Sequence, residues 1–380
     1  MIDQIKKIFK KNYQSINRIE IDTKKLCSNF EYLQSLQKDA ILFPVLKSNA
    51  YGHGLQGIAK MINKLNTPMV AIDSFVEYQY IKKYSHKKVL VLSEMFKENY
   101  RFFDFHISSF CIYNFSTLQY FCQLKKKIKI HLFLNTGMNR EGVDEKDLRE
   151  ILELLKNNSK ITLEGVCSHL AGADESDGKS MEAQIQKFKN LYEKIKEAGF
   201  SPQYRHIGAS AGLLKIRDNF FNAYRPGIAF YGYNPLEKDD KFYAFGEKLQ
   251  PVLSVYSHIV SIHKNLFIGE KVGYNGTFLL EKKSNIASIP FGYFEGLDRR
   301  LSNNGFVKYK GTYISYVGRI SMNISSFDFG EREVFVGDEI EIISTNKEDK
   351  NSIENIAKNI GTISYEILVR FQTQIKRVYK

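Results

Sequence analysis

From Ile19 to about Gly232 the chain alternates short apolar runs with longer amphipathic stretches. This alternation is typical of βα units around a parallel sheet, because strands covered on both faces are apolar throughout whereas each helix exposes a polar face. After a helical stretch at residues 23–38, eight apolar runs predict strands, at residues 41–46, 68–73, 88–93, 105–110, 127–134, 161–168, 204–209 and 224–232. Since eight strands close a barrel, we predict a (β/α)8 barrel of the TIM type.

Beyond Asn234 the pattern changes to alternating apolar and polar residues with frequent Gly and Asn turns. This pattern predicts antiparallel strands with one solvated face, interrupted by one helical segment at about residues 352–360. We therefore expect an α/β protein of two domains. A barrel covers residues 15–235, and a C-terminal, mainly antiparallel β domain covers residues 236–380, with residues 1–14 packing on the β domain.

Composition narrows the class of protein. Of the 380 residues, 43% are hydrophobic and 26% are charged, which is ordinary for a globular protein in water. The N-terminal segment carries charges among its apolar positions, and no later stretch could span a membrane, so we expect a cytoplasmic protein. The four cysteines, Cys27, Cys111, Cys122 and Cys167, form no C-x-x-C pair, which favours a reducing compartment and no metal site.

The net charge of +13 makes nucleic-acid binding an alternative, because counterion release favours binding of basic proteins to phosphate backbones. The lysines are nevertheless spread along the chain, and the only dense runs, at residues 7–11 and 125–129, are short. A solvated, lysine-rich surface is the favoured interpretation. We expect neither a nucleic acid nor a membrane as a partner.

Several chemically capable residues follow the predicted strands, where barrels carry their active sites. They are Lys47 after the first strand, Arg140 after the fifth, His169 after the sixth, Ser210 after the seventh, and Gly227 and Ile228 late in the eighth. An isolated lysine is usually a surface cation, but on this rim Lys47 can form a Schiff base with an aldehyde cofactor such as pyridoxal 5'-phosphate (PLP). The segments HIGASAG (residues 206–212) and RPGIAFYG (residues 225–232) lie where such barrels bind phosphate.

Two further residues would meet the ring of such a cofactor. His169 is either a satisfied core histidine or a side chain that lies against the ring. Arg225 can only donate hydrogen bonds, so a pyridine nitrogen facing it must be an unprotonated acceptor. A ring in that state withdraws electrons less strongly, which favours return of a proton over transamination.

The segment VLKSNAYGHG (residues 45–54) resembles the PLP-attachment signature of the alanine racemases, and the similarity covers nearly the whole chain. In the barrel, NTGMNREG, SHLAGAD and YRPGIAFYG resemble further family segments. In the β domain, EKVGYNGTF, IPFGYFEGLDRR, VGRISMNI and GTISYEIL do so. The resemblance implies fold type III, PLP as the cofactor and a homodimer with shared active sites that converts L-alanine to D-alanine for peptidoglycan.

The resemblance also implies roles for single residues. Lys47 holds the cofactor and is one base, and Tyr274 of the partner subunit is the other. The phosphate is surrounded by Tyr51, Ser210, Gly227, Ile228 and Tyr365. His169 and Arg225 contact the ring, and Arg140 contacts its phenolic oxygen. Arg140 and Met322 bind the substrate, and the entrance is lined by Asp174, Tyr293, Arg299 and Arg319.

The chain departs from the family at three positions. Phe133 stands where many members carry a carbamylated lysine, and Asn135 and Asn323 stand where Asp is common. The loss of these negative charges implies a chloride or similar small anion beside Arg140. Three alternatives stay open: an amino-acid racemase of broader range that acts on serine or other amino acids, a PLP decarboxylase of the same architecture, and a non-catalytic PLP-binding protein.

Overall fold

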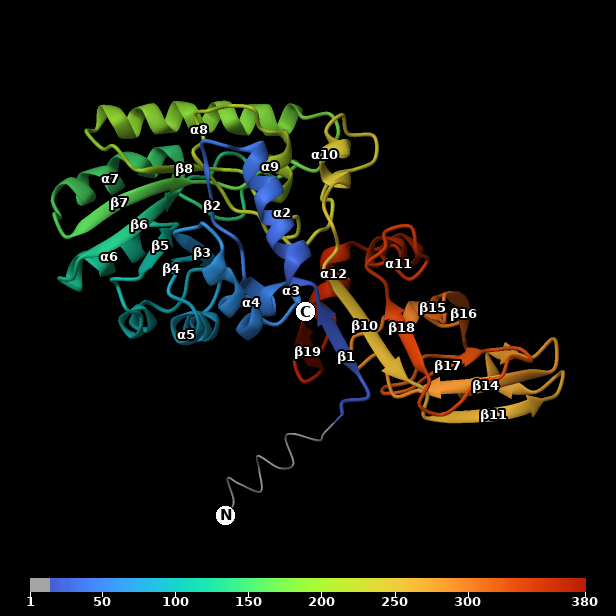
Figure 1. The fold of residues 1–380 in the computed structure, drawn as a ribbon. Helices are drawn as coiled ribbons and strands as arrows, with labels where there is room; N and C mark the ends of the chain where they lie inside the picture. The colour runs from blue at the N-terminus through green and yellow to red at the C-terminus, as the bar shows by residue number, and fades with distance from the viewer. Residues whose placement is uncertain (1–13) are drawn as a thin grey trace, which may run out of the picture. The chain divides into compact units, whose positions relative to one another are not determined.

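The structure, a computed structural model, describes residues 14–380, so the expected packing of residues 1–14 falls outside it apart from the last position. Two compact units make up the chain. One is Thr23–Gln250, and the other joins the segment up to Asp22 to Pro251–Lys380. Figure 1 shows strands and helices in the first unit and mostly strands in the second.

Parallel strands form the frame of the unit Thr23–Gln250. Six of them make one sheet in the order β3-β4-β5-β6-β7-β8, and β2 pairs with β9. The ring closes because Val45 after β2 bridges Ala71 of β3, and because the Arg225 N–H after β9 bonds to the Gly208 carbonyl. The predicted barrel is confirmed. Its strands are β2 (Ile41–Leu42), β3 (Met69–Ile72), β4 (Lys88–Val91), β5 (Ser108–Ile112), β6 (Ile128–Phe133), β7 (Ile161–Cys167), β8 (Tyr204–His206) and β9 (Ala223–Tyr224).

Burial explains the apolar runs of these strands. Every residue of β3, β5 and β7 is buried except Thr162, because one face looks into the barrel and the other lies under helices. The eighth strand is shorter than predicted. It ends at Tyr224, and residues 227–232 form turns, since Pro226 cannot donate to a ladder and a glycine follows it.

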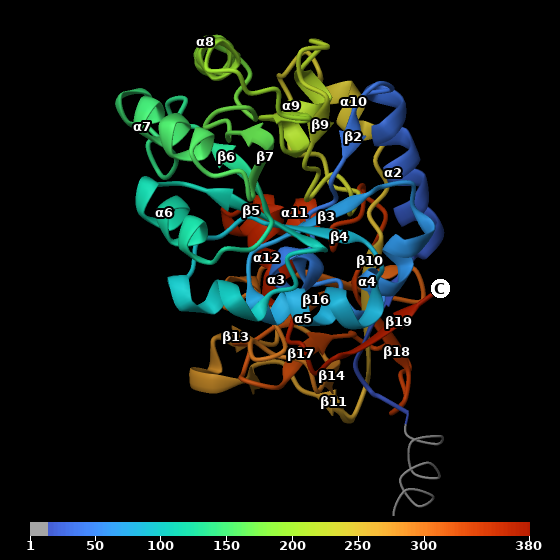
Figure 2. The same ribbon diagram turned by 90° about the vertical axis from the view of Figure 1, so that its left-hand side faces the viewer.

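Helices alternate with the strands and lie around the outside of the sheet, as Figure 2 shows for α5 to α8. The longer ones bury an apolar stripe, as α7 does with Leu148, Ile151 and Leu155. The helices are α2 (Thr23–Leu36), α3 (Lys47–Tyr51), α4 (Leu55–Met61), α5 (Phe75–Tyr84), α6 (Phe115–Gln123), α7 (Glu145–Lys156), α8 (Lys179–Glu197), α9 (Ser210–Lys215) and α10 (Tyr243–Glu247), with 3-10 turns at Ile62–Lys64 and Lys97–Phe102.

The second unit is a nine-stranded sheet in the order β11-β14-β17-β16-β15-β18-β10-β1-β19. All its pairings are antiparallel except that of β1 with β19, so the expected mainly antiparallel architecture is confirmed. Its strands are β1 (Arg18–Ile21), β10 (Leu253–His258), β11 (Ser261–Leu266), β14 (Ser284–Ile289), β15 (Phe306–Tyr309), β16 (Thr312–Val317), β17 (Ser325–Asp328), β18 (Glu339–Ile343) and β19 (Lys376–Tyr379). Beside it, β12 (Lys271–Val272) pairs with β13 (Phe278–Leu279).

The predicted helix near residues 352–360 is α11 (Ile353–Ile360), which begins where the Ser352 hydroxyl accepts the Asn355 N–H. A second helix, α12 (Ser364–Arg370), was not predicted. Its seven residues are too few to show a helical period, and they include β-branched Ile367 and Val369. Two 3-10 turns, η3 (Tyr274–Gly276) and η4 (Arg299–Leu301), complete the unit.

The limits of the units differ from the expected domain boundary. Residues 236–250 belong with the barrel, where Asp240 forms an ion pair of 2.6 Å with Lys215 and both side chains are buried. At the other end, β1 belongs with the sheet of the second unit, because it pairs with β10 and β19. The change of hydrophobic pattern marks where the parallel strands stop, but the chain belongs to the barrel unit for about fifteen residues beyond that point.

Candidate active site

Lys47 lies where the first barrel strand ends, as predicted. The four residues after it, Ser48 to Tyr51, all have left-handed backbone conformations, with φ of 56°, 55°, 54° and 52°. Because a left-handed turn costs an L-residue about 1 kcal/mol or more, four in succession need support from their surroundings. Part of that support is the side chain of Asn49, whose oxygen accepts the Leu55 N–H at 2.8 Å.

Further support comes from the neighbouring strand-to-helix loop. The Glu77 carboxylate accepts the Ser48 N–H at 2.7 Å and the Asp73 N–H at 2.7 Å, and it also completes the capping box of α5. The Lys47 ammonium lies 3.0 Å from the Asp73 carboxylate. The Glu77 carboxylate thus fixes the backbone beside Lys47 and at Asp73, the two residues of this ion pair.

Four residues predicted to surround a phosphate lie together at the ends of β8 and β9. The Ser210 hydroxyl accepts the Gly227 N–H at 3.0 Å and the Ala229 N–H at 3.1 Å. A Cβ added at Gly227 would lie 2.3 Å from the hydroxyl of Tyr51, so only glycine allows this approach. Ile228, between the two bonded N–H groups, is also buried here. The result is a cradle in which hydroxyl groups and backbone N–H groups lie together, and these are the kinds of group that bind a phosphate.

Arg225 is buried beside this cradle and is 4% exposed. Its Nη1 donates to the His206 Nδ1 and carbonyl, and its Nη2 donates to the Ser168 carbonyl at 2.6 Å and contacts His169 Nδ1 at 3.5 Å. No partner of its Nε–H is found among the described residues. A ring nitrogen acting as acceptor would satisfy that donor, so the residues present fit a pyridine cofactor.

The charges of three cations of the predicted site act on His169. Burial, followed by the charges of Arg225, Arg140 and Lys47, lowers the pKa of His169 to about 3. The imidazole is therefore neutral at physiological pH. The 3.5 Å between Arg225 Nη2 and His169 Nδ1 shows that the structure brings these two predicted residues together.

Arg140 and Asp174 lie at the surface of the same barrel unit. The Arg140 guanidinium is 56% exposed and bonds to the Glu141 carboxylate at 2.9 Å. Asp174 is exposed in the loop after β7. Asn135 shapes the loop before Arg140, since its oxygen accepts the N–H groups of Gly137 and Asn139 at 3.2 Å.

Phe133, at the position of the lysine discussed above, packs in the barrel core at a ring distance of 4.8 Å from Tyr113. It offers no polar atom to Arg140. Glu141, the carboxylate bonded to that arginine, was not singled out from the sequence.

The site residues predicted in the second unit are exposed. Tyr274 is 67% exposed and Met322 is 55% exposed. Tyr293 and Tyr365 are also exposed, as are Arg299 and Arg319. Tyr274 begins the turn η3 after Gly273, which has a φ of 73° and whose added Cβ would lie 3.3 Å from the Arg319 backbone N. The loops of Tyr274 and Arg319 therefore lie side by side.

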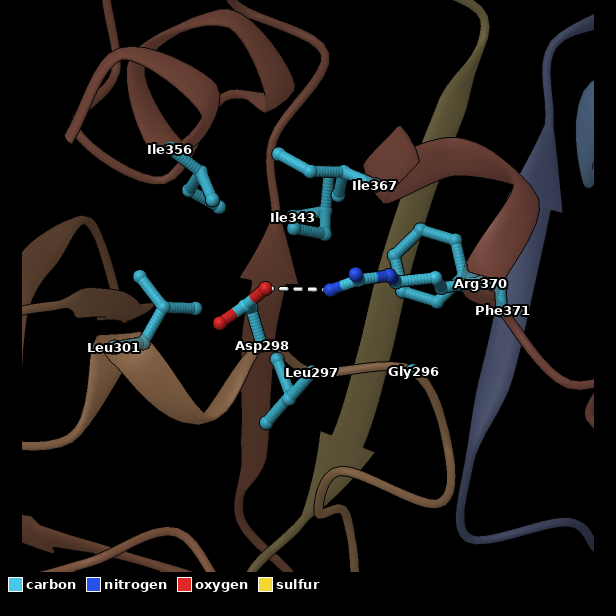
Figure 3. Close-up of a pocket in the computed structure, with 9 residues that line it drawn as sticks. All are labelled: Gly296, Leu297, Asp298, Leu301, Ile343, Ile356, Ile367, Arg370 and Phe371. Carbon is cyan, nitrogen blue, oxygen red and sulfur yellow. Dashed lines mark hydrogen bonds and ion pairs between the residues drawn. The ribbon is translucent and has the colours of Figure 1, made fainter. Parts of the chain in front are cut away.

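A small apolar pocket in this unit is lined in part by residues of α12 (Figure 3). Arg370, at the end of α12, bonds to Asp298 at 2.5 Å, and Arg300 bonds to the same carboxylate at 2.7 Å. These bonds lower the pKa of Asp298 to about 2. The pocket is lined by Gly296, Leu297, Asp298, Leu301, Ile343, Ile356, Ile367, Arg370 and Phe371. Through this anchor, the segment of Tyr293 and Arg299 is joined to the helix that carries Tyr365.

Both units match models of one family. Residues 21–235 match the alanine racemase N-terminal domain, and residues 252–379 match the alanine racemase C-terminal domain. The chain belongs to the alanine racemase family. Family members are isomerases, and the family resemblance noted in the sequence is confirmed.

Individual relatives are similar over nearly their whole length. Alanine racemase 1 of Caldanaerobacter subterraneus subsp. tengcongensis is 30% identical over 95% of this chain and 94% of its own. The alanine racemase of Clostridium tetani is 31% identical, with the same two coverages. Among solved structures, alanine racemase of Clostridium difficile 630 has a TM-score of 0.89 and 28% identity, covering 97% of both chains. That of Bartonella henselae, with covalently bound pyridoxal phosphate, has a TM-score of 0.83 and 25% identity, covering 97% of this chain and 100% of its own.

Residues 14–380 lack two features. None of their helices combines the length and apolar character needed to cross a membrane. No three His, Cys, Asp or Glu side chains in these residues are grouped as metal ligands would be.

Sequence reasoning missed several polar residues of the barrel. Asp73 ends the second predicted strand and satisfies the strand-end criterion that selected Lys47, so the signal was available. Glu77 carried the signal of a capping box, Ser74 followed three residues later by Glu. Glu164 was visible as a lone carboxylate in an apolar strand.

Proposed function

We propose that this protein interconverts L- and D-alanine with PLP held by Lys47. The observation that carries the proposal is the arrangement in the barrel unit: Lys47 at a strand end, a cradle suited to phosphate, and the unused Nε–H of Arg225. The Bartonella henselae structure contains covalently bound pyridoxal phosphate, and a Bacillus anthracis structure contains bound L-Ala-P. These neighbours support both the cofactor and the substrate class.

Tyr51, Ser210, Gly227, Ile228 and Tyr365 would hold the cofactor phosphate. Arg225 would donate its Nε–H to the ring nitrogen, and neutral His169 would lie against the ring. When bound, PLP supplies an electron sink that makes the α-proton of an amino acid removable. Because Arg225 remains a donor, it leaves the ring nitrogen unprotonated, which favours return of a proton to the same carbon.

Racemisation needs one base on each face of the α-carbon. We assign these roles to the Lys47 amine and to the phenol of Tyr274 of the partner subunit. Tyr274 is 67% exposed and Met322 is 55% exposed, as expected for groups that a second copy covers. Arg140 and Met322 would orient the substrate carboxylate, and Asp174, Tyr293, Arg299 and Arg319 would line its entrance.

The test of this function is direct. Purified protein loaded with PLP is incubated separately with L-alanine, L-serine and L-lysine, and each D-form is measured. Formation of D-alanine alone supports the proposal, and comparable rates with serine would favour a racemase of broader range. Bound PLP without any D-amino acid would instead favour a non-catalytic PLP-binding protein.

We further propose that the activity supplies D-alanine for peptidoglycan in the cytoplasm. The family membership and the absence of a membrane-spanning helix among residues 14–380 are consistent with this role. Expression in a bacterial strain that needs added D-alanine should restore growth without it. Failure to restore growth, with active protein present in the cells, would contradict the role.

A chloride or similar anion beside Arg140 is also proposed, because Phe133 cannot be carbamylated. The carboxylate of Glu141, 2.9 Å from Arg140, competes for the same role. Activity should depend on chloride and not on bicarbonate, and Glu141→Gln should increase the dependence on chloride. Unchanged activity in chloride-free acetate buffer, with no halide site in bromide-soaked crystals, would contradict the chloride proposal.

A further inference from the structure

A carboxylate is buried inside the barrel, and two features of the backbone place it there. Strands β6 and β7 pair Ile130 with Leu163 but His131 with Gly165, so Glu164 is the extra residue of a β-bulge. A bulge redirects the side chain of its extra residue, and Glu164 is only 5% exposed. At the next position, a Cβ on Gly165 would lie 2.4 Å from the His131 ring, so glycine leaves room for that ring.

A chain of hydrogen bonds runs from this carboxylate to Arg225. Glu164 Oε2 contacts His131 Nε2 at 3.4 Å, His131 Nδ1 contacts His206 Nε2 at 2.7 Å, and His206 Nδ1 bonds to Arg225 Nη1. Both imidazoles are fully buried, and the ring of Phe43 packs edge-on against each of them. The chain is therefore fixed by packing as well as by hydrogen bonds.

The direction of every bond follows from Arg225, because a guanidinium only donates. His206 Nδ1 must accept, so its Nε2 carries the proton and donates to His131 Nδ1. His131 in turn carries its proton on Nε2 and donates to the carboxylate. Burial lowers the pKa of both histidines, which keeps each imidazole neutral with a single proton.

The far end of the chain is an ionised carboxylate, and its ion-pair partner Lys129 is 40% exposed, so water screens the charge of that lysine more than the charge of the buried carboxylate. Burial alone would raise the pKa of the Glu164 carboxyl, but hydrogen bonds from His131, Lys129 and Ser109 lower it to about 2. Lys129 and Ser109 both lie 2.5 Å from it. Arg225, by contrast, has only neutral hydrogen-bond partners among residues 14–380: carbonyls and imidazoles. A buried guanidinium without a direct carboxylate needs its charge balanced from farther away.

We propose that Glu164 and His131 are positioning residues that balance the charge of Arg225 and fix its hydrogen-bond partner in one tautomer. The inference rests on the proposed function in one respect, the assignment of Arg225 to the cofactor ring. With the charge balanced, Arg225 withdraws less electron density from that ring, and the proton returns to the substrate carbon. Without the carboxylate, stronger withdrawal would divert more turnovers to transamination.

Two variants and a matched control test the charge. Glu164→Gln keeps the shape and removes the charge, and Ser109→Ala removes only one hydrogen bond to the carboxylate. Ser108→Ala is the control, because this neighbouring hydroxyl is equally buried and has no hydrogen-bond partner among residues 14–380. The measured quantity is the number of racemisation turnovers per transamination event, followed by conversion of PLP to its amine form.

Glu164→Gln should increase the transamination share by about tenfold, the order that Coulomb's law gives for unit charges separated by two buried side chains. Ser109→Ala should increase it less, and Ser108→Ala should not change it. If Glu164→Gln fails to fold, Ser109→Ala against Ser108→Ala decides the question. If the variants and the control show the same number of racemisation turnovers per transamination event, the proposal is overturned.

Neutron diffraction from crystals of the wild-type enzyme tests the tautomers without any measurement of activity. We expect deuterium on Nε2 of both His131 and His206, and none on Nδ1. Deuterium on His206 Nδ1 would overturn the inference even in an active racemase. Conversely, a protein that racemises no amino acid but shows the expected tautomers would contradict the proposed function and leave the hydrogen-bond chain intact.

Discussion

Apart from the exposed Arg140 and Asp174, the site residues of the barrel unit are fixed by contacts within their unit, whereas those of the second unit are exposed. In the barrel, Arg225 is buried, Ser210 accepts two backbone N–H groups, and Lys47 is paired with Asp73. In the second unit, Tyr274 and Met322 are more than half exposed. A group that must bind a cofactor before any substrate arrives can be fixed by its own unit. Exposed aromatic and apolar groups at a predicted site indicate that this half is completed by something else, which we propose to be a second copy.

The largest effect is expected from Lys47→Ala. The change removes both the attachment point of the cofactor and one base, so racemisation should fall by about 10⁴-fold, the upper range for a general base. The yellow absorbance that borohydride traps on one peptide should disappear. If the variant still trapped the cofactor on another lysine, the assignment of Lys47 as the attachment point would be wrong.

Tyr274→Phe should have the next largest effect, a loss of about 10³-fold in racemisation with PLP still bound. The variant keeps the ring and removes only the proton-bearing oxygen. Exchange of the α-proton by Lys47 should persist for one enantiomer, as measured by deuterium incorporation. Equal loss of exchange from both enantiomers would count against a two-base mechanism.

Mixing these two inactive variants tests whether the exposed half is completed by a partner. In a dimer with shared sites, a mixed pair contains one site with both changes and one native site, so random reassociation should restore about one quarter of wild-type activity. No recovery, with mixed dimers demonstrated by mass spectrometry, would mean that each chain supplies its own Tyr274.

The two regions also differ in how far the sequence predicted them. Apolar runs identified the barrel strands, since strands buried on both faces leave a strong signal, and strand ends identified Lys47 and Ser210. Strand register and side-chain contacts were not predictable, because they depend on residues far apart in the chain. The bulge at Glu164 and the link from Glu77 to Ser48 are of this kind. Helix α12 was missed because seven residues leave little periodic signal.

Gly227→Ala tests how tightly the barrel half is built. The added methyl group would lie 2.3 Å from the Tyr51 hydroxyl, and overpacking of this kind costs about 1–3 kcal/mol. The affinity for PLP should fall by about tenfold or more, as measured by titration of the apoenzyme. Gly212→Ala is the control, since its methyl group meets the ends of the Leu170 and Ile216 side chains, at 3.2 Å and 3.5 Å. Equal affinities in both variants would show that the cradle is looser than its contacts indicate.

The smallest effect concerns acid stability of the buried half. The pKa of His169 is lowered from its usual value near 6.5 to about 3 in the folded protein, by burial first and then by Arg225, Arg140 and Lys47. Between these values the unfolded chain binds a proton that the folded chain does not, so the free energy of unfolding must fall as pH falls. One such group contributes at most about 1.4 kcal/mol per pH unit. His169→Gln should therefore reduce the loss of stability of the apoenzyme between pH 7 and pH 5, measured by urea unfolding. The same change at exposed His263 in the second unit should leave the pH dependence as in the wild type, and equal slopes for all three proteins would show that the His169 imidazole is not held neutral by the barrel.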